Sequence, residues 1–270
     1  MRLICISAEA AEICWSLGAW DQVVGVTAFA RKHFPIKPIV SGFASGSVER
    51  ILALAPDLVI SFSDVQTKLI DQMVRAGVNV FALSYFNLAG VAQAISLLGR
   101  LLGVPQKGED LAHEFNLALS AGRFSPPVRP RVYFEEWDDP LIHAVPWVQE
   151  IIELAGGDYV FKKSGSNRAP DRVVTEGMVF SMNPEIILAS WCGKSVDLAA
   201  IRARSGFAGM EAVKQCRVYS IDPKKILQAG PQLLDGLKEI RTIIQDLVRA
   251  STKSALVTLA GESVAYENNL

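Results

Sequence analysis

Aromatic side chains dominate the places in this sequence where a small molecule could bind. They lie at the predicted carboxyl ends of strands or in the loops that follow: Phe29, Phe43, Phe62, Tyr85, Phe86, Trp137 and Trp191. Any one of them could simply plug the core, but so many at corresponding places predict a binding surface. Flat apolar walls with a few polar groups suit a large, flat and partly apolar ligand.

An acidic run, Glu135-Glu136-Trp137-Asp138-Asp139, adds polar chemistry, and His143 follows it closely. Carboxylates near a histidine could hold a hard cation, and His143 could ligate a metal or the metal centre of a bound chelate. The alternatives are a solvated run, in which one or two carboxylates hydrogen-bond a ligand, and an ordinary loop histidine. A basic loop follows, which could meet acidic groups of a ligand or be surface charge: Lys162, Lys163, Arg168 and Arg172.

The sequence contains little that could catalyse a reaction. It has no Gly-x-Ser-x-Gly elbow, and the small flexible stretch Ser41–Gly46 lacks the lysine of a phosphate-binding loop. The histidines, His33, His113 and His143, are far apart in the sequence. No nucleophile and base are visible as a pair, so we expect a protein that is not an enzyme and has no intrinsic cofactor.

Composition excludes several other classes. The chain has 270 residues, with Lys+Arg 27 and Asp+Glu 28, so the formal net charge is 27 − 28 = −1. A nucleic-acid binder needs a clear basic excess, and a disordered chain would have fewer than the 50% hydrophobic residues found here. This length predicts one large or two medium domains.

We expect neither a membrane span nor an export signal. The longest uncharged stretch, residues 76–99, contains polar residues and two glycines, so it is not the apolar run that a spanning helix needs. The chain begins without an apolar signal core. We therefore expect a cytoplasmic protein if Met1 is the native start, or an extracytoplasmic one if a signal was trimmed.

The four cysteines, Cys5, Cys14, Cys192 and Cys216, do not form a metal or redox motif, because no two of them have the necessary spacing. We expect most of them to be small buried hydrophobes.

Short apolar runs alternate with helical patterns along the chain. Strands are predicted at 3–7, 23–27, 58–62, 78–83, 131–134, 159–160, 186–190 and 217–221. Helices are predicted between them, with a long one at 106–123 before a proline-rich break and a strong one at 232–249. Continuous Val/Ile/Leu strands separated by helices indicate parallel sheets that are covered on both faces.

The two halves of the chain echo each other. The stretch from Ile51 to Ile60 matches that from Val179 to Leu188: a short helix stops before a proline, then an acidic residue and a buried strand follow. A second echo pairs residues 17–24 with 154–161. We therefore expect two similar α/β lobes of Rossmann-like fold, with boundaries at 1–104, a linking helix at 105–124, a second lobe at 129–250 and a loose tail at 251–270.

With these landmarks the chain resembles the substrate-binding proteins of ABC importers that have a rigid helical backbone and bind cobalamin, ferric siderophores or haem. The segment Ser47–Ile60 is very similar to that family's most recognisable stretch. The segments Glu136–Pro140, Trp147-Val148, Glu153–Gly157 and Cys192-Gly193 resemble the cobalamin-binding branch.

The resemblance implies a ligand cleft between the lobes, at the carboxyl ends of their strands. The leading hypothesis is a monomeric protein that binds a corrinoid or a similar metal chelate. Phe29, Phe43, Phe62, Trp137 and Trp191 would pack on the macrocycle, with Tyr85 beside them. Glu136, Asp138 and Asp222 would accept hydrogen bonds from its amide groups, and His143 is a possible axial metal ligand.

Two alternatives stay open. The same fold could bind haem, a ferric siderophore or an oxyanion, and an anionic ligand would recruit Arg31, Lys162, Lys163 or Arg168. In a different class, an intracellular metal-handling protein or metal-dependent enzyme would use Glu135, Glu136 and His143 around a cation. Phenylalanine at 29, 43 and 62, where Tyr or Trp is common in the cobalamin branch, leaves the ligand open.

The resemblance also implies an ABC permease with its ATPase as partners, docked through an exposed glutamate on each lobe. Glu49 fits that role in the first lobe, seven residues before Pro56. In the second lobe Gly177 stands seven residues before Pro184, and Glu176 lies one further back. Glu176 is therefore the nearest candidate for the second contact.

Overall fold

The computed structural model describes residues 1–30, 34–62, 64–161 and 168–267. Its contacts divide the chain into two compact units. The first is Met1–Ser120 with Lys224–Leu234, and the second is Ala121–Pro223 with Asp235–Leu270. The chain therefore returns to the first unit for a short segment before its last helix.

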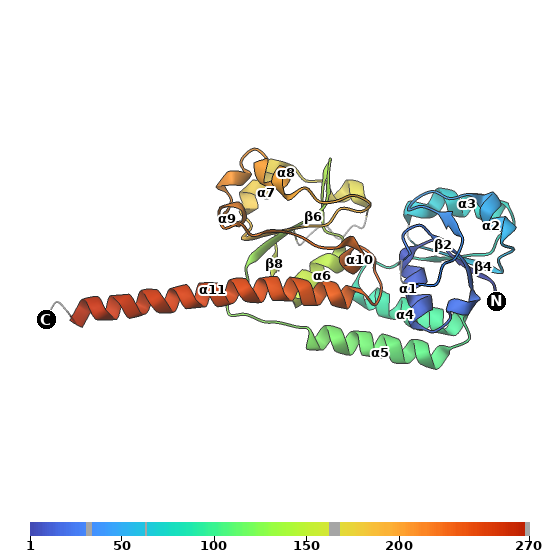
Figure 1. Cartoon of the computed structure of the whole chain (residues 1–270), viewed down its shortest axis with the longest axis horizontal. Helices are drawn as coiled ribbons and strands as arrows, with labels where there is room; N and C mark the ends of the chain where they lie inside the picture. Colours follow the sequence, from blue (N-terminus) through green and yellow to red (C-terminus); the bar gives the residue numbers. More distant parts are fainter. Residues whose placement is uncertain (31–33, 63, 162–167, 268–270) are drawn as a thin grey trace. The chain divides into compact units, whose positions relative to one another are not determined.

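In the first unit, the described residues form a parallel sheet in the order β3-β2-β1-β4-β5. The strands are β1 (Leu3–Cys5), β2 (Val23–Thr27), β3 (Ile39–Ser41), β4 (Leu58–Phe62) and β5 (Val80–Leu83). The helices are α1 (Ala8–Ser16), α2 (Val48–Ala53), α3 (Thr67–Arg75) and α4 (Leu88–Leu101), with 3-10 turns η1 (Trp20–Gln22) and η2 (Asp64–Gln66). Helices α2 and α3 lie on one side of this sheet, and α1 and α4 on the other (Figure 1).

The alternating side chains of β1 explain this arrangement. Ile4 packs in one core with Ile51 of α2 and Met73 of α3. Cys5 points the other way and contacts Cys14 of α1. Burying both faces of a strand requires helices on both sides of the sheet, so the expected α/β layers are confirmed.

In the second unit, the order is β10-β9-β6-β7, and β8 also pairs with β6. The strands are β6 (Arg131–Asp138), β7 (Leu141–His143), β8 (Asp158–Tyr159), β9 (Ile186–Ala189) and β10 (Val218–Ser220). All described pairings are parallel except the β6–β7 hairpin. The helices are α6 (Pro146–Leu154), α7 (Glu176–Met182), α8 (Leu198–Ala203) and α9 (Glu211–Lys214), with η3 (Ala169–Arg172) and η4 (Phe207–Gly209).

The two sheets share their pairing order. Strands β2-β1-β4-β5 correspond in order to β8-β6-β9-β10. Three further helices are α5 (Pro105–Ala121), α10 (Pro223–Ile226) and α11 (Leu233–Glu267). Helix α5 begins one residue before the long helix predicted at 106–123 and ends two residues earlier.

The structure corrects two predictions about local structure. The acidic run is not a loop after the strand, because β6 continues through Asp138 and pairs with β7. The loose tail is wrong over residues 251–267, because α11 runs to Glu267. That stretch has no proline, and Ala, Leu, Lys and Glu alternate in it with weaker helix formers, so the sequence allows the helix to continue. Within the part of the chain that the structure describes, no helix is long and apolar enough to cross a membrane.

Candidate functional site

Four predicted aromatic residues gather as two pairs at the carboxyl edge of the first sheet. Phe29, just after β2, meets Phe43 edge-on at 6.0 Å between ring centroids. Phe62, at the end of β4, meets Tyr85 edge-on at 4.9 Å. Phe43 is 53% exposed whereas Tyr85 is buried. This edge therefore carries apolar rings, and their role in binding stays a prediction.

A glutamine that the sequence analysis missed positions two of these rings. The buried Gln66 of η2 donates from its amide to the carbonyls of Ile6 (2.7 Å) and Phe43 (2.9 Å). Its Oε1 accepts from the backbone N–H of Phe62 at 3.1 Å. One side chain thus joins β1's exit, the loop that carries Phe43 and the end of β4. No sequence motif marks a glutamine that bonds three separate backbone segments in this way.

Tyr85 holds the returning segment Lys224–Leu234 rather than leaving its hydroxyl for a ligand. Its hydroxyl donates to the carbonyl of Ala229 at 2.5 Å. The carboxylate of Glu9, in the first turn of α1, is stabilised by hydrogen bonds from its own backbone N–H, from Ser7 and from the backbone of Ala229. Burial nevertheless raises the pKa of Glu9 to about 7, since those hydrogen bonds only partly offset it. Burial, and then the charge of Glu9, raises the pKa of Tyr85.

In the second unit, Lys194 joins two predicted aromatic residues at the carboxyl edge. Its Nζ lies 4.2 Å from the ring centroid of Trp137 and 4.9 Å from that of Trp191. It also pairs with Asp138 at 2.5 Å. Gly193, at φ +84°, makes the turn that returns Lys194 over β9's end. A cation on two indole faces is a stable arrangement, and it was not predicted from the sequence.

Trp191 is almost fully buried and is fixed by a buried ion pair. Its Nε1 donates to Glu135 at 3.2 Å. Arg204 makes two hydrogen bonds to the same carboxylate, one of them at 2.9 Å. Burial acts to lower the pKa of Arg204, but the bonds and charge of Glu135 raise it overall. The two charged groups face each other and are shielded from solvent, so this ion pair serves the structure of the unit.

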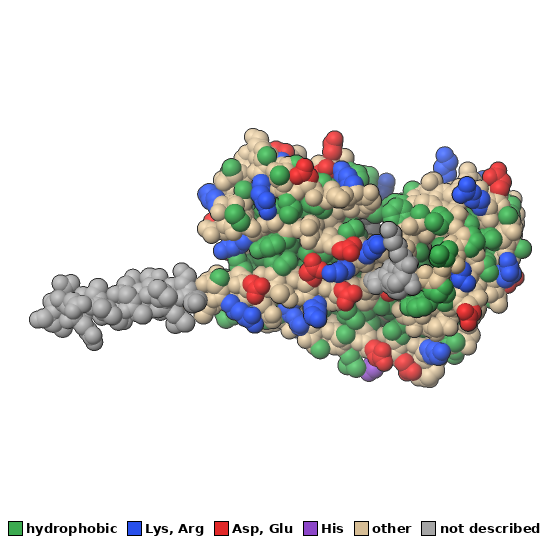
Figure 2. Space-filling view, viewed as in Figure 1, with side chains coloured by type: hydrophobic (Ala, Val, Ile, Leu, Met, Phe, Trp, Pro, Cys, Tyr) green, Lys and Arg blue, Asp and Glu red, His purple; other side chains and the backbone are tan. Residues whose placement is uncertain are grey.

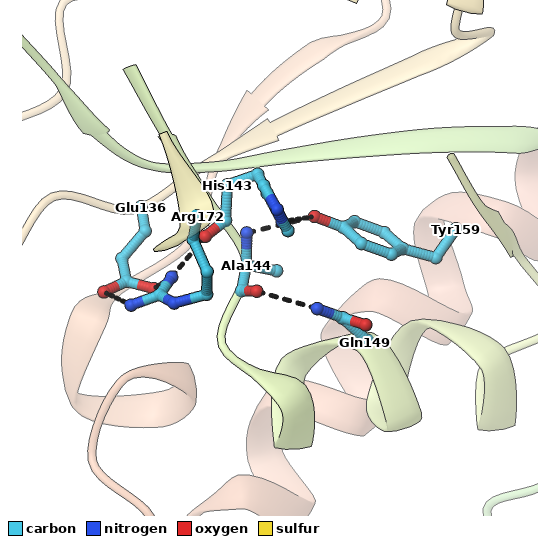
Figure 3. A network of polar contacts seen from close by, with 6 residues as sticks. All are labelled: Glu136, His143, Ala144, Gln149, Tyr159 and Arg172. Atoms are coloured by element: carbon cyan, nitrogen blue, oxygen red, sulfur yellow. Dashed lines mark hydrogen bonds and ion pairs between the residues drawn. The ribbon is translucent and has the colours of Figure 1, made fainter. Parts of the chain in front are cut away.

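The predicted ligand contact Glu136 is already engaged by Arg172 (Figure 3). Arg172 donates to both carboxylate oxygens, at 2.5 and 3.0 Å, and also to the carbonyl of His143. Only 2% of the Arg172 side chain is exposed, against 20% of that of Glu136. This network pins η3 against β7, beside the bridge between Ile142 and Val173.

His143 lies on β7 rather than in a loop, and its ring is buried. Its Nδ1 hydrogen-bonds the Tyr159 hydroxyl at 2.9 Å, and the N–H of Ala144 donates to the same oxygen at 3.0 Å (Figure 3). The ring stacks on Phe161 at 5.2 Å. Burial, and then the charge of Arg172, lowers the pKa of His143 to about 4. The ring is therefore neutral at physiological pH, and its role toward a metal stays a prediction.

The other predicted residues are dispersed. Asp222 is exposed just after β10, and Glu49 is exposed in the first turn of α2, where it accepts from Ser47 at 3.1 Å. Glu176 begins α7 and is half-buried. Phe86 is 38% exposed next to Tyr85. Arg31, Lys162 and Lys163 lie outside the described residues.

On the face drawn in Figure 2, charged side chains of one sign do not gather into a single patch. Acidic and basic side chains are interspersed on the face drawn in Figure 2, in keeping with a net charge of −1. Among the described residues, no group of three or more His, Cys, Asp or Glu could hold a metal ion. The chemistry at both sheet edges is therefore that of aromatic walls with a few fixed charges.

Comparison with known proteins agrees with this architecture. The family model described as "Periplasmic binding protein" matches residues 3–225. An uncharacterized ABC transporter substrate-binding lipoprotein, YvrC of Bacillus subtilis, is 25% identical over 252 residues, which cover 88% of this chain and 78% of that protein. A vitamin B12-binding protein of Vibrio parahaemolyticus is 24% identical over 246 residues, or 88% and 87% of the two chains.

Solved structures share the fold. The periplasmic haem-binding protein RhuT of Roseiflexus sp. RS-1, in apo form, superimposes with a TM-score of 0.78 and 24% identity, covering 92% of this chain and 98% of that one. The periplasmic vitamin B12-binding protein BtuF of Vibrio cholerae has a TM-score of 0.73 and 21% identity, over 92% and 97%. The matched proteins are substrate-binding proteins rather than enzymes, which removes the metal-dependent enzyme as an alternative. The chain belongs to the periplasmic binding protein family and is an ABC transporter substrate-binding protein.

Proposed function

We propose that this protein binds a corrinoid, or a metal chelate of similar size and flatness, and delivers it to an ABC permease. The observation that carries the proposal is the set of aromatic faces at the carboxyl edges of both sheets, where Phe43 is exposed and Trp137 half-exposed. Such faces bury a flat macrocycle well. Relatives named as vitamin B12-binding proteins support the corrinoid class.

A titration of the purified protein with cyanocobalamin, dicyanocobinamide and haemin tests the proposal, read by calorimetry and tryptophan fluorescence. We expect one-to-one, submicromolar binding of a corrinoid. Trp137→Ala should weaken it at least tenfold, about 1.4 kcal/mol, without unfolding the protein. The matched control is Trp15→Ala, because Trp15 lies in the last turn of α1, away from the carboxyl edge. No binding to any of the three chelates would contradict the proposal.

A second candidate ligand is a chelate with carboxylates, such as haem. The observation that favours it is Lys194, whose ammonium lies over Trp137 and Trp191. A bound carboxylate there would gain a charge-assisted hydrogen bond. Tighter binding of haemin than of either corrinoid in the same titration would select this candidate.

We propose that Glu49 and Glu176 are the permease contacts. They lie in the first turns of two corresponding helices, α2 and α7, and each helix ends shortly before a proline and a strand of the sheet. Glu49→Ala should spare chelate binding and impair transport with the cognate permease and ATPase. Asp71→Ala is the control, since Asp71 is an exposed acid on α3. Loss of chelate affinity in Glu49→Ala would show that Glu49 acts in binding instead.

We further propose that the protein acts outside the cytoplasmic membrane as a monomer. The family and the lipoprotein relative support this location. Protease treatment of intact spheroplasts from the native cell should digest it while a cytoplasmic marker survives. Protection from the protease would contradict the proposed location.

A further inference from the structure

Two cysteine thiols meet inside the first unit. The Sγ of Cys5, on β1, lies 3.7 Å from the Sγ of Cys14, on α1, and donates a hydrogen bond to it. Both side chains are fully buried. The other two cysteines, Cys192 and Cys216, belong to the second unit. Cys5 and Cys14 are therefore within reach of each other.

We propose that Cys5 and Cys14 close into a disulfide under oxidising conditions, which fastens α1 to the central strand β1 within the native fold. A disulfide needs its sulfurs at about 2.0 Å, so rotation of the two side chains must bring them roughly 1.7 Å closer. They stand on adjacent packed elements, nine residues apart in the chain.

The reaction balances with a disulfide oxidant such as glutathione disulfide. One cysteine, as thiolate, attacks the oxidant, releases one glutathione and forms a mixed disulfide. The second thiolate displaces the other glutathione, and each cysteine gives up one proton. The two protein sulfurs are oxidised and one glutathione disulfide is reduced to two thiols.

The surroundings of the two thiols decide when this reaction can happen. The hydrogen bond to Cys14, and then burial, raises the pKa of the Cys5 thiol, which disfavours the reactive thiolate. Oxidation should therefore be slow in the folded protein and fast during folding. An oxidising compartment would give the bridged form, and a reducing one the free thiols.

The sequence allows a direct test. Trypsin cuts after Arg2 and Arg31, so Cys5 and Cys14 fall in one peptide, residues 3–31, whereas Cys192 and Cys216 fall in two others. The full chain is unfolded, refolded in a glutathione redox buffer, denatured, alkylated and digested. We expect peptide 3–31 without alkylation and about 2 Da lighter than its dithiol form. The other two cysteines should be alkylated.

Two results would overturn the proposal. One is a peptide 3–31 that carries two alkyl groups after oxidative refolding. The other is an oxidised protein with a lower thermal midpoint than the reduced one, since a bridge compatible with the native fold should not destabilise it. The double variant C192S/C216S must give the same light peptide, and dithiothreitol must restore both alkylations.

Discussion

Arg2 and Arg131 make corresponding contacts in the two halves of the chain. Each immediately precedes or begins the strand at the centre of its sheet. The backbone N–H of Arg2 donates to the Asp57 carboxylate at 2.6 Å, and that of Arg131 to the Glu185 carboxylate at 3.0 Å. The matched landmarks in the sequence therefore correspond to one repeated piece of polar architecture.

Both arginines also hold a corner at which the backbone has positive φ. Ala55 has φ 42° and Asn183 has φ 39°, each directly before a proline. The carbonyl of Ala55 accepts from Arg2 at 3.1 Å, and that of Asn183 from Arg131 at 3.0 Å. Asparagine tolerates this region of backbone space, whereas alanine adopts it only at a cost.

Ala55→Gly should therefore stabilise the protein. A left-handed backbone costs a non-glycine residue about 1–2 kcal/mol, and the substitution removes this cost. Glycine also gives the unfolded chain more freedom, which destabilises the folded state by roughly 0.4–1 kcal/mol. We therefore expect a net gain in stability of about 0.5–1 kcal/mol. Asn183→Gly is the comparison. It should destabilise, because Asn183 also accepts from the Glu211 N–H at 3.1 Å. Urea midpoints measure both, and a lower midpoint for Ala55→Gly would contradict the strain.

The sequence predicted the layers because apolar runs and proline corners are local signals. It missed the β6–β7 hairpin because the acidic residues of β6 read as a loop. Glu135 is in fact fully buried, and its charge is balanced there by Arg204, 69 residues later. The continuation of α11 was missed because small polar residues after 250 read as a tail.

For the candidate site, the sequence predicted which residues lie at the strand ends but not what they contact. Residues at strand ends, such as Phe62 and Trp137, could be placed on an edge from the strand pattern alone. The contacts around them could not be predicted. Gln66 lies only four residues from Phe62, but no motif marks that contact. In the second unit the charged partners are far apart in the sequence: Lys194 is 56 residues from Asp138, and Arg172 is 36 from Glu136. Such pairs obey no spacing rule, so only the fold shows which charge meets which.

Glu9 should make the stability depend on pH in the neutral range. Its pKa is raised from the usual 4.5 to about 7, so the folded state binds the proton more tightly than the unfolded one. The associated stability is fully present below pH 4.5 and is lost as pH rises through 7. Glu9→Gln should thus be more stable than the wild type at pH 8, by up to about 3 kcal/mol, and similar at pH 4.5.

Urea titrations at several pH values would measure this effect. Glu49→Gln, which changes an exposed carboxylate, is the control and should keep the wild-type profile. Parallel profiles for Glu9→Gln and the wild type would show that Glu9 is not the group responsible.

His143 should make the protein less stable as the pH falls, which is the opposite of the effect of Glu9. Its pKa is lowered from 6.5 to about 4, so its contribution is present above pH 6.5 and is lost as pH falls through 4. His143→Asn keeps an acceptor for Tyr159 but removes the titration. Between pH 6.5 and pH 4 the variant should therefore lose less free energy of unfolding than the wild type, by up to about 3 kcal/mol. His113→Asn, on the exposed side of α5, should retain the wild-type slope.

Lys194 should discriminate between the candidate chelates. Its ammonium lies over Trp137 and pairs with Asp138, so it can offer a cation to a carboxylate but little to the neutral amides of a corrinoid. Lys194→Met keeps the length of the side chain and removes its charge. We expect haemin binding to weaken about tenfold, or 1.4 kcal/mol, and dicyanocobinamide binding to change less than about twofold.

The tryptophan emission of the ligand-free protein should also change in this variant, because the cation is removed from the indole faces. Lys214→Met, exposed at the end of α9, should alter neither affinity nor emission. Equal losses for both chelates would mean that Lys194 supports the aromatic wall by packing and does not select by charge.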